Sequence, residues 1–191
     1  MQESIINLIN DSIRNFSNIS KDKEQVLLIE QITNTIIDAY NNDCKLLLCG
    51  NGGSASDAQH IAAELSGRFE MDREPLNAEA LHVNSSYLTA VANDYGYEEV
   101  YARMVKATGK NGDVLLALST SGNSSNVLKA IEQANHIGMT TIGFSGNDGG
   151  KMNEICKYNL IIPSSNTARI QEAHILVGHI VCKLIEQKIF K

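Results

Sequence analysis

The stretch KLLLCGNGGSASDAQHIAAEL, residues 45–65, decides the fold class. Its first part is a continuous apolar run, which is typical of a strand buried on both faces of a parallel sheet. A turn rich in glycine and serine follows, and the apolar spacing then changes to the three- and four-residue steps of a helix over Ala55–Gly67. The stretch therefore predicts a strand–turn–helix unit of an α/β protein.

The turn of this unit has the composition of an anion-binding site. Its glycines let the backbone approach a ligand closely, and its serines supply hydroxyls at a helix start whose free N–H groups favour an anion. His60 and Glu64 follow four residues apart, on one face of the helix. The residues alone leave two interpretations of this pair open: a solvent-facing pair, or a proton-transfer or metal-binding pair.

Further apolar runs and helical stretches extend the unit into a sheet. With Lys45–Cys49, the runs that predict strands are Ala80–Val83, Val114–Leu118, Thr140–Phe144 and Leu160–Ile162. Helical segments follow most of them, so we expect a three-layer αβα sandwich around a five-stranded, mostly parallel sheet. Ligands of open α/β sheets bind outside the carboxyl ends of the strands, so the chemistry should lie in the turns leaving these runs.

Two amphipathic helices, Glu3–Phe16 and Asp22–Tyr40, precede the first strand. A chain of 191 residues is long enough for one sizeable core, so we expect one domain over 1–191, with 1–42 as a helical N-terminal extension. The apolar faces of these helices must be buried against the domain or against another subunit. We expect the extension to take part in oligomer packing.

Composition excludes several classes of protein. A formal net charge of −6 argues against a nucleic-acid binder, which needs a basic face. No apolar segment is long enough to span a membrane, and the N-terminus has no basic start or apolar stretch of an export signal. The cysteines form no C-x-x-C pair, which favours reduced core thiols and a cytoplasmic location. They are Cys44, Cys49, Cys156 and Cys182.

A second unusual turn, LSTSGNSSN at residues 118–126, leaves the third strand run and opens a helix. Its hydroxyls and backbone N–H groups can surround a phosphate without a lysine, whereas the bland interpretation is an ordinary serine-rich helix cap. We favour the first interpretation, in which this turn binds a phosphate or a phosphosugar. The first turn fits G-x-G-x-x-A loosely, but no acid ends the next strand for a ribose, and the P-loop motif is absent, which argues against nucleotides.

The last helix, about Ala168 to Gln187, carries a second set of candidate residues. We expect its core stripe to be Ala173, Leu176, Val177, Ile180, Val181 and Leu184. The opposite face carries Gln171, Ile175, His179 and Cys182, and its apolar members indicate that another element or subunit covers it. His174 and His136 are interpreted as structural. Imidazole, carboxylate and amide groups suit zinc, but spacing alone does not predict a metal site here.

Together, NGGSASDAQHIAAEL, LSTSGNSSNVLKAI and QEAHILVGHIVC resemble the bacterial phosphoheptose isomerases (sedoheptulose 7-phosphate isomerases), a branch of the sugar isomerase (SIS) domain superfamily. The resemblance covers nearly the whole chain and implies a SIS-type, flavodoxin-like fold and a homotetramer. It also implies an aldose–ketose isomerase that converts sedoheptulose 7-phosphate to D-glycero-D-manno-heptose 7-phosphate through an enediol. That reaction is the first step of nucleotide-activated heptose synthesis for surface glycans such as lipopolysaccharide or capsule.

The resemblance also assigns site residues. The resemblance implies one zinc ion per subunit, and the ligands of this zinc are His60, Glu64, Gln171 and His179. It also implies that Glu64 and His179 are the acid–base pair. The implied substrate-binding residues are Asn51, Gly52, Gly53, His60, Glu64, Asn93, Asp94, Ser119, Thr120, Ser121, Ser124 and Gln171. A carboxylate on zinc is a weaker base, so Glu64 must leave the metal or Asp94 must contribute.

Two other functions compete with this one. Some SIS proteins are non-catalytic tetrameric adaptors that bind the replication initiator protein; Glu64, Gln171 and His179 together favour catalysis, because an adaptor has no chemical need for them. The second alternative is another sugar-phosphate isomerase or a sugar-phosphate sensor. A sensor normally carries a DNA-binding domain, and the chain has no room for one.

Overall fold

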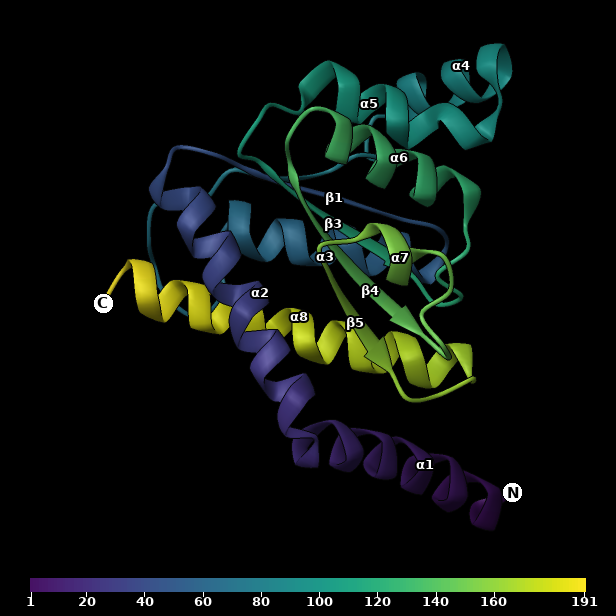
Figure 1. Ribbon diagram of the computed structural model, residues 1–191. Helices are drawn as coiled ribbons and strands as arrows, with labels where there is room; N and C mark the ends of the chain where they lie inside the picture. The colour runs from purple at the N-terminus through teal and green to yellow at the C-terminus, as the bar shows by residue number, and fades with distance from the viewer.

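The computed structural model describes residues 1–191 and contains a five-stranded sheet in which every strand is parallel to its neighbours (Figure 1). The strand order is β2-β1-β3-β4-β5. The strands are β1 Leu46–Gly50, β2 Ala78–Ala80, β3 Val114–Ser119, β4 Thr140–Gly146 and β5 Tyr158–Ile162. The expected α/β class and the five strands are confirmed.

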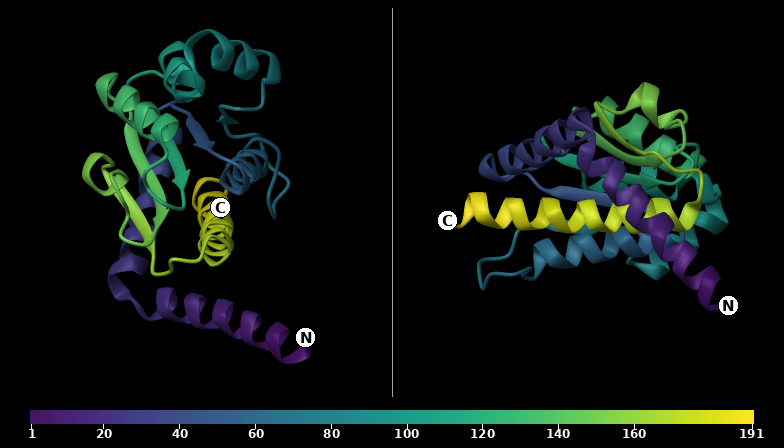
Figure 2. Two further views of the ribbon diagram at one scale, coloured as in Figure 1. Left: turned by 90° about the vertical axis from the view of Figure 1, so that its right-hand side faces the viewer. Right: turned by 90° about the horizontal axis from the view of Figure 1, so that it is seen from below.

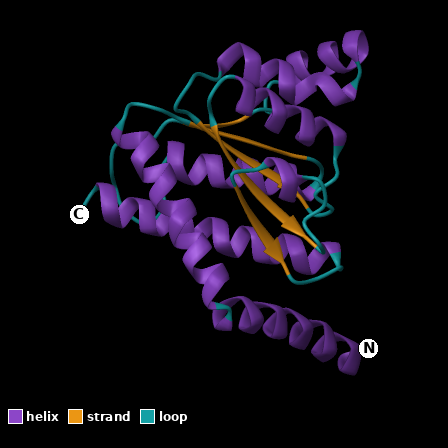
Figure 3. Cartoon of the chain, in the orientation of Figure 1, coloured by secondary structure: helices purple, strands orange, loops and turns teal.

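Helices fill most of the remaining chain (Figure 3). They are α1 Gln2–Lys21, α2 Lys23–Asn41, α3 Gly53–Ser66, α4 Ser85–Tyr95, α5 Val100–Thr108, α6 Ser125–His136, α7 Met152–Ile155 and α8 Thr167–Ile189, with a 3-10 turn, η1, at Tyr97–Glu99. The two expected N-terminal helices are α1 and α2. Asp22 separates them, because its carboxylate accepts hydrogen bonds from the first N–H groups of α2. None of the helices is both long and apolar enough to cross a membrane.

Alternating side chains of β1 build two separate cores. Leu46 and Leu48 belong to a core shared with α2, α3 and α8, whereas Leu47 and Cys49 belong to a core shared with α4, α5 and α6. Because successive side chains of a strand point to opposite faces, the sheet is covered on both sides. Figure 2 shows these three layers from two further directions.

The adjacent strands β1 and β3 send their helices to opposite faces of the sheet. α3 follows β1 into the first core and α6 follows β3 into the second. The two turns therefore diverge at neighbouring strand ends, which leaves a crevice between them. This is the topological switch point at which open α/β sheets bind ligands.

The expected strand Ala80–Val83 is shifted in the structure to Ala78–Ala80. β2 is an edge strand paired only with β1, and its last ladder bond runs from the Leu81 N–H to Leu48 O at 2.8 Å. The chain then turns toward Asn84, which caps α4 by accepting a hydrogen bond from the Tyr87 N–H. Val83 belongs to this turn and is exposed.

The expected core stripe of the last helix is wrong for three residues. Leu176, Ile180 and Leu184 are 37–40% exposed, whereas Cys182, expected on the outward face, is fully buried. The reason is that α8 packs against α2 and α3 as well as the sheet, so its buried arc is wide and rotated. The three residues line an apolar groove of about 570 Å³ whose other wall includes Phe16 and Val26.

Helix α1 projects away from the sheet layers and touches the start of α8 (Figures 1 and 2). The Asn15 amide donates to Arg169 O at 3.0 Å, and the Ser12 hydroxyl donates to Glu172 at 2.9 Å. Most of its apolar side chains stay uncovered. Ile5, Ile6, Leu8, Ile9 and Ile13 are each 50–58% exposed.

Candidate active site

The glycine turn between β1 and α3 is shaped to bring the backbone against a ligand and against α8. Gly52 has a φ of +55°, in the left-handed region that favours glycine, and stands at the start of α3 with no side chain capping the helix. At Gly53 an added Cβ would lie 2.5 Å from the Gln171 side-chain nitrogen. The amide of Gln171 therefore lies directly on the turn.

The serine turn between β3 and α6 lies beside the glycine turn. The hydroxyls of Ser119 and Ser124 are 3.0 Å apart, and Ser124 stands at the start of α6 without capping it. The N–H groups of Ser125 and Asn126 at the start of α6 thus have no capping side chain and are available to an anion. Ser121 is exposed and its hydroxyl accepts a hydrogen bond from the Asn123 N–H at 3.2 Å.

A pocket of about 310 Å³ joins the two turns. Its lining is almost wholly polar: Asn51, Gly52, Gly53, Ser54, Leu118, Ser119, Thr120, Ser124, Thr167 and Gln171. The structure thus brings most of the expected substrate residues together, while Ser121 lies in the same turn outside the lining. Phosphate and sugar hydroxyls match these donors and acceptors.

A reciprocal pair of amides connects the two turns. The side chains of Asn51 and Asn126 each donate to the other, at 2.8 and 2.9 Å, and the Tyr97 hydroxyl donates to Asn51 at 3.2 Å. Asn126 is buried, and its Oδ1 also accepts from the Val127 N–H. Asn126 is a site residue that was not among those predicted from the sequence. Its signal is a polar residue inside the apolar stripe of α6.

His60, Glu64 and His179 form a cluster in which one ligand atom from each lies within 4.8 Å of the others. His60 Nε2 is 3.0 Å from Glu64 Oε1 and 3.0 Å from His179 Nε2. The Phe69 ring stacks on His179 with 5.6 Å between ring centroids. α3 supplies two of the three residues and α8 the third, because these helices pack side by side.

The donor set of the cluster fits a zinc ion. Two imidazole nitrogens and a carboxylate oxygen are preferred zinc ligands. Ligand atoms around a tetrahedral zinc lie roughly 3.3 Å apart, close to the 3.0 Å between His60 Nε2 and each of its two neighbours in the cluster. Only one N–H can lie between the two facing Nε2 atoms, so either one ring accepts from the other or both face a cation. Gln171 lies at the glycine turn, and its part as a fourth ligand stays a prediction.

Asp57 is a half-buried acid on α3, three residues before His60 and seven before Glu64, so all three share one helix face. Burial raises the pKa of Asp57 to about 6, although the neighbouring His60 charge opposes the shift. Its Oδ2 has no hydrogen-bond partner. Asp57 was not among the residues predicted from the sequence, although its i, i+3, i+7 spacing with His60 and Glu64 is a signal for it.

Asn93 and Asp94 lie at the end of α4, and both are exposed. The Asn93 amide donates to Asp94 at 2.9 Å, and neither side chain bonds to the turns or to the cluster. Their roles in substrate binding stay predictions. The nearest link from this part of the chain to the site is Tyr97, through Asn51.

Comparison with known proteins matches residues 9–146 to the SIS domain model. A phosphoheptose isomerase of Clostridium acetobutylicum is 50% identical over 95% of this chain and 93% of its own length. This chain belongs to the phosphoheptose isomerase family of SIS domain proteins. The family expected from the two serine–glycine turns and the last helix is confirmed.

Solved structures of this family have the same fold as the chain. The phosphoheptose isomerase GmhA from Neisseria gonorrhoeae is 42% identical and superposes with a TM-score of 0.92, covering 97% of this chain and 98% of that one. A phosphoheptose isomerase from Francisella tularensis is 35% identical with a TM-score of 0.93 over the same shares. The two N-terminal helices are therefore part of the shared architecture.

Proposed function

We propose that this chain is an aldose–ketose isomerase that converts sedoheptulose 7-phosphate to D-glycero-D-manno-heptose 7-phosphate through an enediol. The observation that carries the proposal is the convergence of His60, Glu64 and His179 on the helices that also carry the polar pocket. The names of the relatives support the reaction class. The product would feed nucleotide-activated heptose synthesis for a surface glycan such as lipopolysaccharide or capsule.

Each part of the site has a defined task in this reaction. The serine turn holds the phosphate, and the turn at Asn51–Gly53 holds the sugar. Glu64 removes the proton from C1 of the ketose and returns it to C2, while His179 moves the hydroxyl proton from O1 to O2. Glu64 Oε1 faces His60, which leaves Oε2 outside this contact for the proton transfer. The atoms of ketose and aldose then balance.

His60, Glu64 and His179, with Gln171 as a proposed fourth ligand, would hold a zinc ion that polarises the carbonyl as a Lewis acid and stabilises the enediolate. Because a carboxylate on zinc is a weaker base, Glu64 would act as the base only when its carboxylate is off the metal. The chain's own residues supply the proton transfers. In this proposal α3 positions Glu64 beside the carbon that it deprotonates, and α8 positions His179 beside the oxygens O1 and O2.

We further propose a cytoplasmic homotetramer. The free state of all four cysteines supports a reducing compartment. Oligomerisation is supported by the uncovered apolar side chains of α1 and by the groove at Leu176, Ile180 and Leu184, since a monomer rarely leaves so much apolar surface in water.

The test is an assay of the purified protein against a panel of ketose phosphates, combined with elemental analysis. We expect turnover of sedoheptulose 7-phosphate, about one zinc per chain, and a fall in kcat of about 10²–10⁴-fold in Glu64→Gln and His179→Ala, because each removes a proton-transfer group. Loss of zinc to a chelator should lower the activity as well.

His136→Ala is the matched control, since His136 is an exposed histidine at the end of α6, far along the chain from the cluster. Circular dichroism checks that the variants fold. Near-normal turnover in both Glu64→Gln and His179→Ala would contradict the site assignment. Absence of turnover on every ketose phosphate would favour the adaptor function instead.

A further inference from the structure

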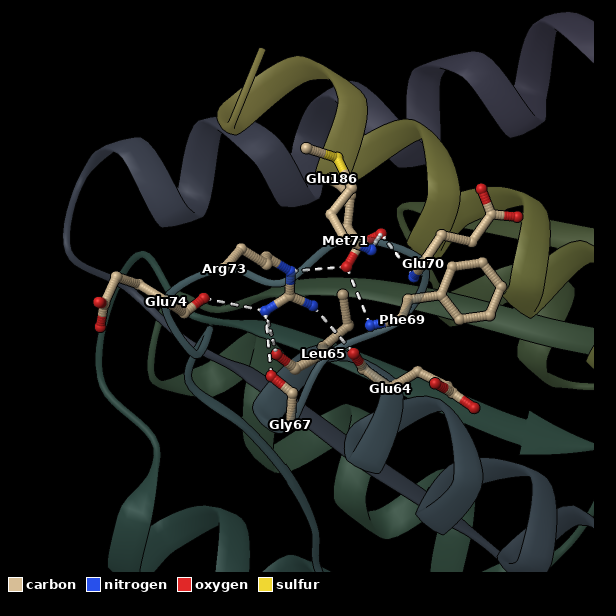
Figure 4. A network of polar contacts seen from close by, with 9 residues as sticks. All are labelled: Glu64, Leu65, Gly67, Phe69, Glu70, Met71, Arg73, Glu74 and Glu186. Carbon is tan, nitrogen blue, oxygen red and sulfur yellow. Dashed lines mark hydrogen bonds and ion pairs between the residues drawn. The ribbon is translucent and has the colours of Figure 1, made fainter.

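The loop between α3 and β2, residues 67–77, lies against α8 near the cluster and is held there by a buried ion pair (Figure 4). The Arg73 Nε lies 2.8 Å from Glu186 Oε1, and both side chains are 1% exposed. A buried charge pair of this kind is costly to desolvate, so it needs further hydrogen bonds to be tolerated. Both partners have them.

The Glu186 carboxylate holds the near end of the loop through its backbone. Its oxygens accept hydrogen bonds at 2.9–3.2 Å from the N–H groups of Phe69, Glu70 and Met71. Burial alone would raise the pKa of Glu186, but these bonds and the Arg73 guanidinium hold that pKa below its ordinary value. The carboxylate is therefore charged and fixes three consecutive peptide units against α8.

The Arg73 guanidinium holds the end of α3. Its Nη2 donates to Glu64 O and its Nη1 to Leu65 O, both at 2.9 Å, and Nη1 also donates to Glu74 O at 3.0 Å. The carbonyls at a helix C-terminus have no partner within the helix, so a cation there satisfies them. Arg73 thus fixes the backbone of Glu64 itself.

The same loop reaches the second member of the acid–base pair through Phe69. The Phe69 N–H donates to Glu186, and its ring stacks on the His179 imidazole with an interplanar angle of 24°. His179 lies on α8 seven residues before Glu186, so the carboxylate and the imidazole lie on one side of that helix. Figure 4 shows the side chains of Phe69 and Glu64 both to the right of the ion pair.

We infer that Arg73 and Glu186 are positioning residues that set the Glu64 backbone and the His179 ring relative to one another. Neither touches the polar pocket, so they act through Glu64 and through the Phe69 ring. The inference rests on the proposed acid–base roles of Glu64 and His179. Its consequence is that weakening the pair changes the rate of proton transfer more than it changes substrate binding.

The experiment compares Glu186→Gln and Arg73→Lys with the wild-type protein by steady-state kinetics and by the ¹H NMR signals of the His179 ring. We expect kcat to fall by about tenfold or more, because misplacing a reacting group by about 1 Å is enough for this, while KM stays within about twofold. The ring signals should shift in both variants, since Phe69 would no longer hold its place over the imidazole.

Phe69→Leu calibrates the NMR readout, because it removes the ring current from His179 and leaves the ion pair intact. The matched control is Glu70→Gln, which breaks the exposed Lys183–Glu70 contact of 3.0 Å between the same loop and the same helix. We expect wild-type kcat and unchanged His179 signals in this control. If Glu186→Gln fails to fold, Arg73→Lys tests the inference alone. This variant keeps the positive charge beside Glu186 but removes the guanidinium N–H groups that bond to the carbonyls of α3.

The inference is overturned if a folded Glu186→Gln or Arg73→Lys keeps the wild-type kcat and the wild-type His179 signals, or if Glu70→Gln loses as much activity as they do. The NMR readout needs no turnover. A wild-type protein without isomerase activity would therefore contradict the proposed function, and the shift of the His179 signals would still test the positioning.

Discussion

At the scale of single residues, Asn126 connects the two turns through its side chain. It lies in the first turn of α6, is buried, and exchanges two hydrogen bonds with Asn51 on the glycine turn. No other side-chain bond joins these two turns directly. Removal of one amide leaves a buried polar partner unsatisfied, which costs about 1–3 kcal/mol.

We therefore predict that Asn126→Ala raises KM for the ketose phosphate by about tenfold, since loss of about 1.4 kcal/mol in alignment and binding corresponds to that factor. Steady-state kinetics measures it. Asn135→Ala is the control, because Asn135 also bonds from α6 to neighbouring elements, through Ile155 O and Thr141, but away from the site. A KM unchanged in Asn126→Ala, or raised equally in both variants, would refute the alignment role.

The cluster of His60, Glu64 and His179 could be predicted only in part from the local sequence pattern. The helical spacing of His60 and Glu64 is local, so their shared face is predictable. Their contact with His179 depends instead on how α3 packs on α8, and His179 is 119 positions after His60. Family resemblance, and not spacing, predicted that contact. The burial of Asp57 and Asn126 is likewise a property of the packed fold and not of the local pattern.

At the scale of elements, the carboxylate of Glu186 links α8 to the α3–β2 loop in a pH-dependent way. Its pKa in the folded chain lies below that of an unfolded glutamate, about 4.3, so the native state binds fewer protons than the unfolded state. The stabilisation is fully present above that pH and is lost as the pH falls through the lower, folded pKa.

We predict that the difference in free energy of unfolding between wild type and Glu186→Gln is largest near pH 7 and shrinks as the pH is lowered from about 4.5 toward 3. Urea unfolding followed by circular dichroism at several pH values measures it. The exposed Glu70→Gln serves as the reference. A difference that stays constant from pH 7 to pH 3 would show that the Glu186 carboxylate does not contribute through its charge.

The bounds of helices and strands were predictable where the hydrophobic pattern of the sequence is strong. They were less predictable where contacts between elements determine which residues are buried. The continuous apolar runs of β1 and β3 are buried on both faces, and their positions are predicted to within a residue or two. The edge strand β2 is short and half-exposed, and the apolar residues continue past its end into the turn at Leu81–Val83. The sequence pattern therefore does not mark where the strand stops. The three misassigned leucine and isoleucine positions of α8 reflect packing on several sides.

At the scale of the whole molecule, α1 buries little of its apolar surface within a single chain. It contacts the rest of the chain through α2 and the start of α8, and its apolar residues from Ile5 to Ile13 are uncovered. Pairing with a second copy would bury this surface at roughly 25 cal/mol per Å² of apolar area.

We predict that Ile13→Glu, which puts a charge on the apolar side of α1, lowers the oligomeric state and the protein mass measured by analytical ultracentrifugation, because a buried unpaired carboxylate is costly. Asn7→Glu adds the same charge to the polar side of the helix and should leave the mass unchanged. A wild-type mass equal to one chain, or an oligomer that survives Ile13→Glu, would contradict this use of α1.

The pairing of β1 with β3 has a consequence for the choice of substrate. These strands are in register from Leu46 with Val114 to Gly50 with Leu118, so the ladder fixes the two points at which the turns leave the sheet. In the proposed binding mode, the serine turn would hold the phosphate end of a sugar phosphate, and the cluster formed by α3 and α8 would meet the other end. In that binding mode the sheet would fix the distance between the two ends of the site, and a sugar phosphate with a shorter carbon chain would reach only one of them.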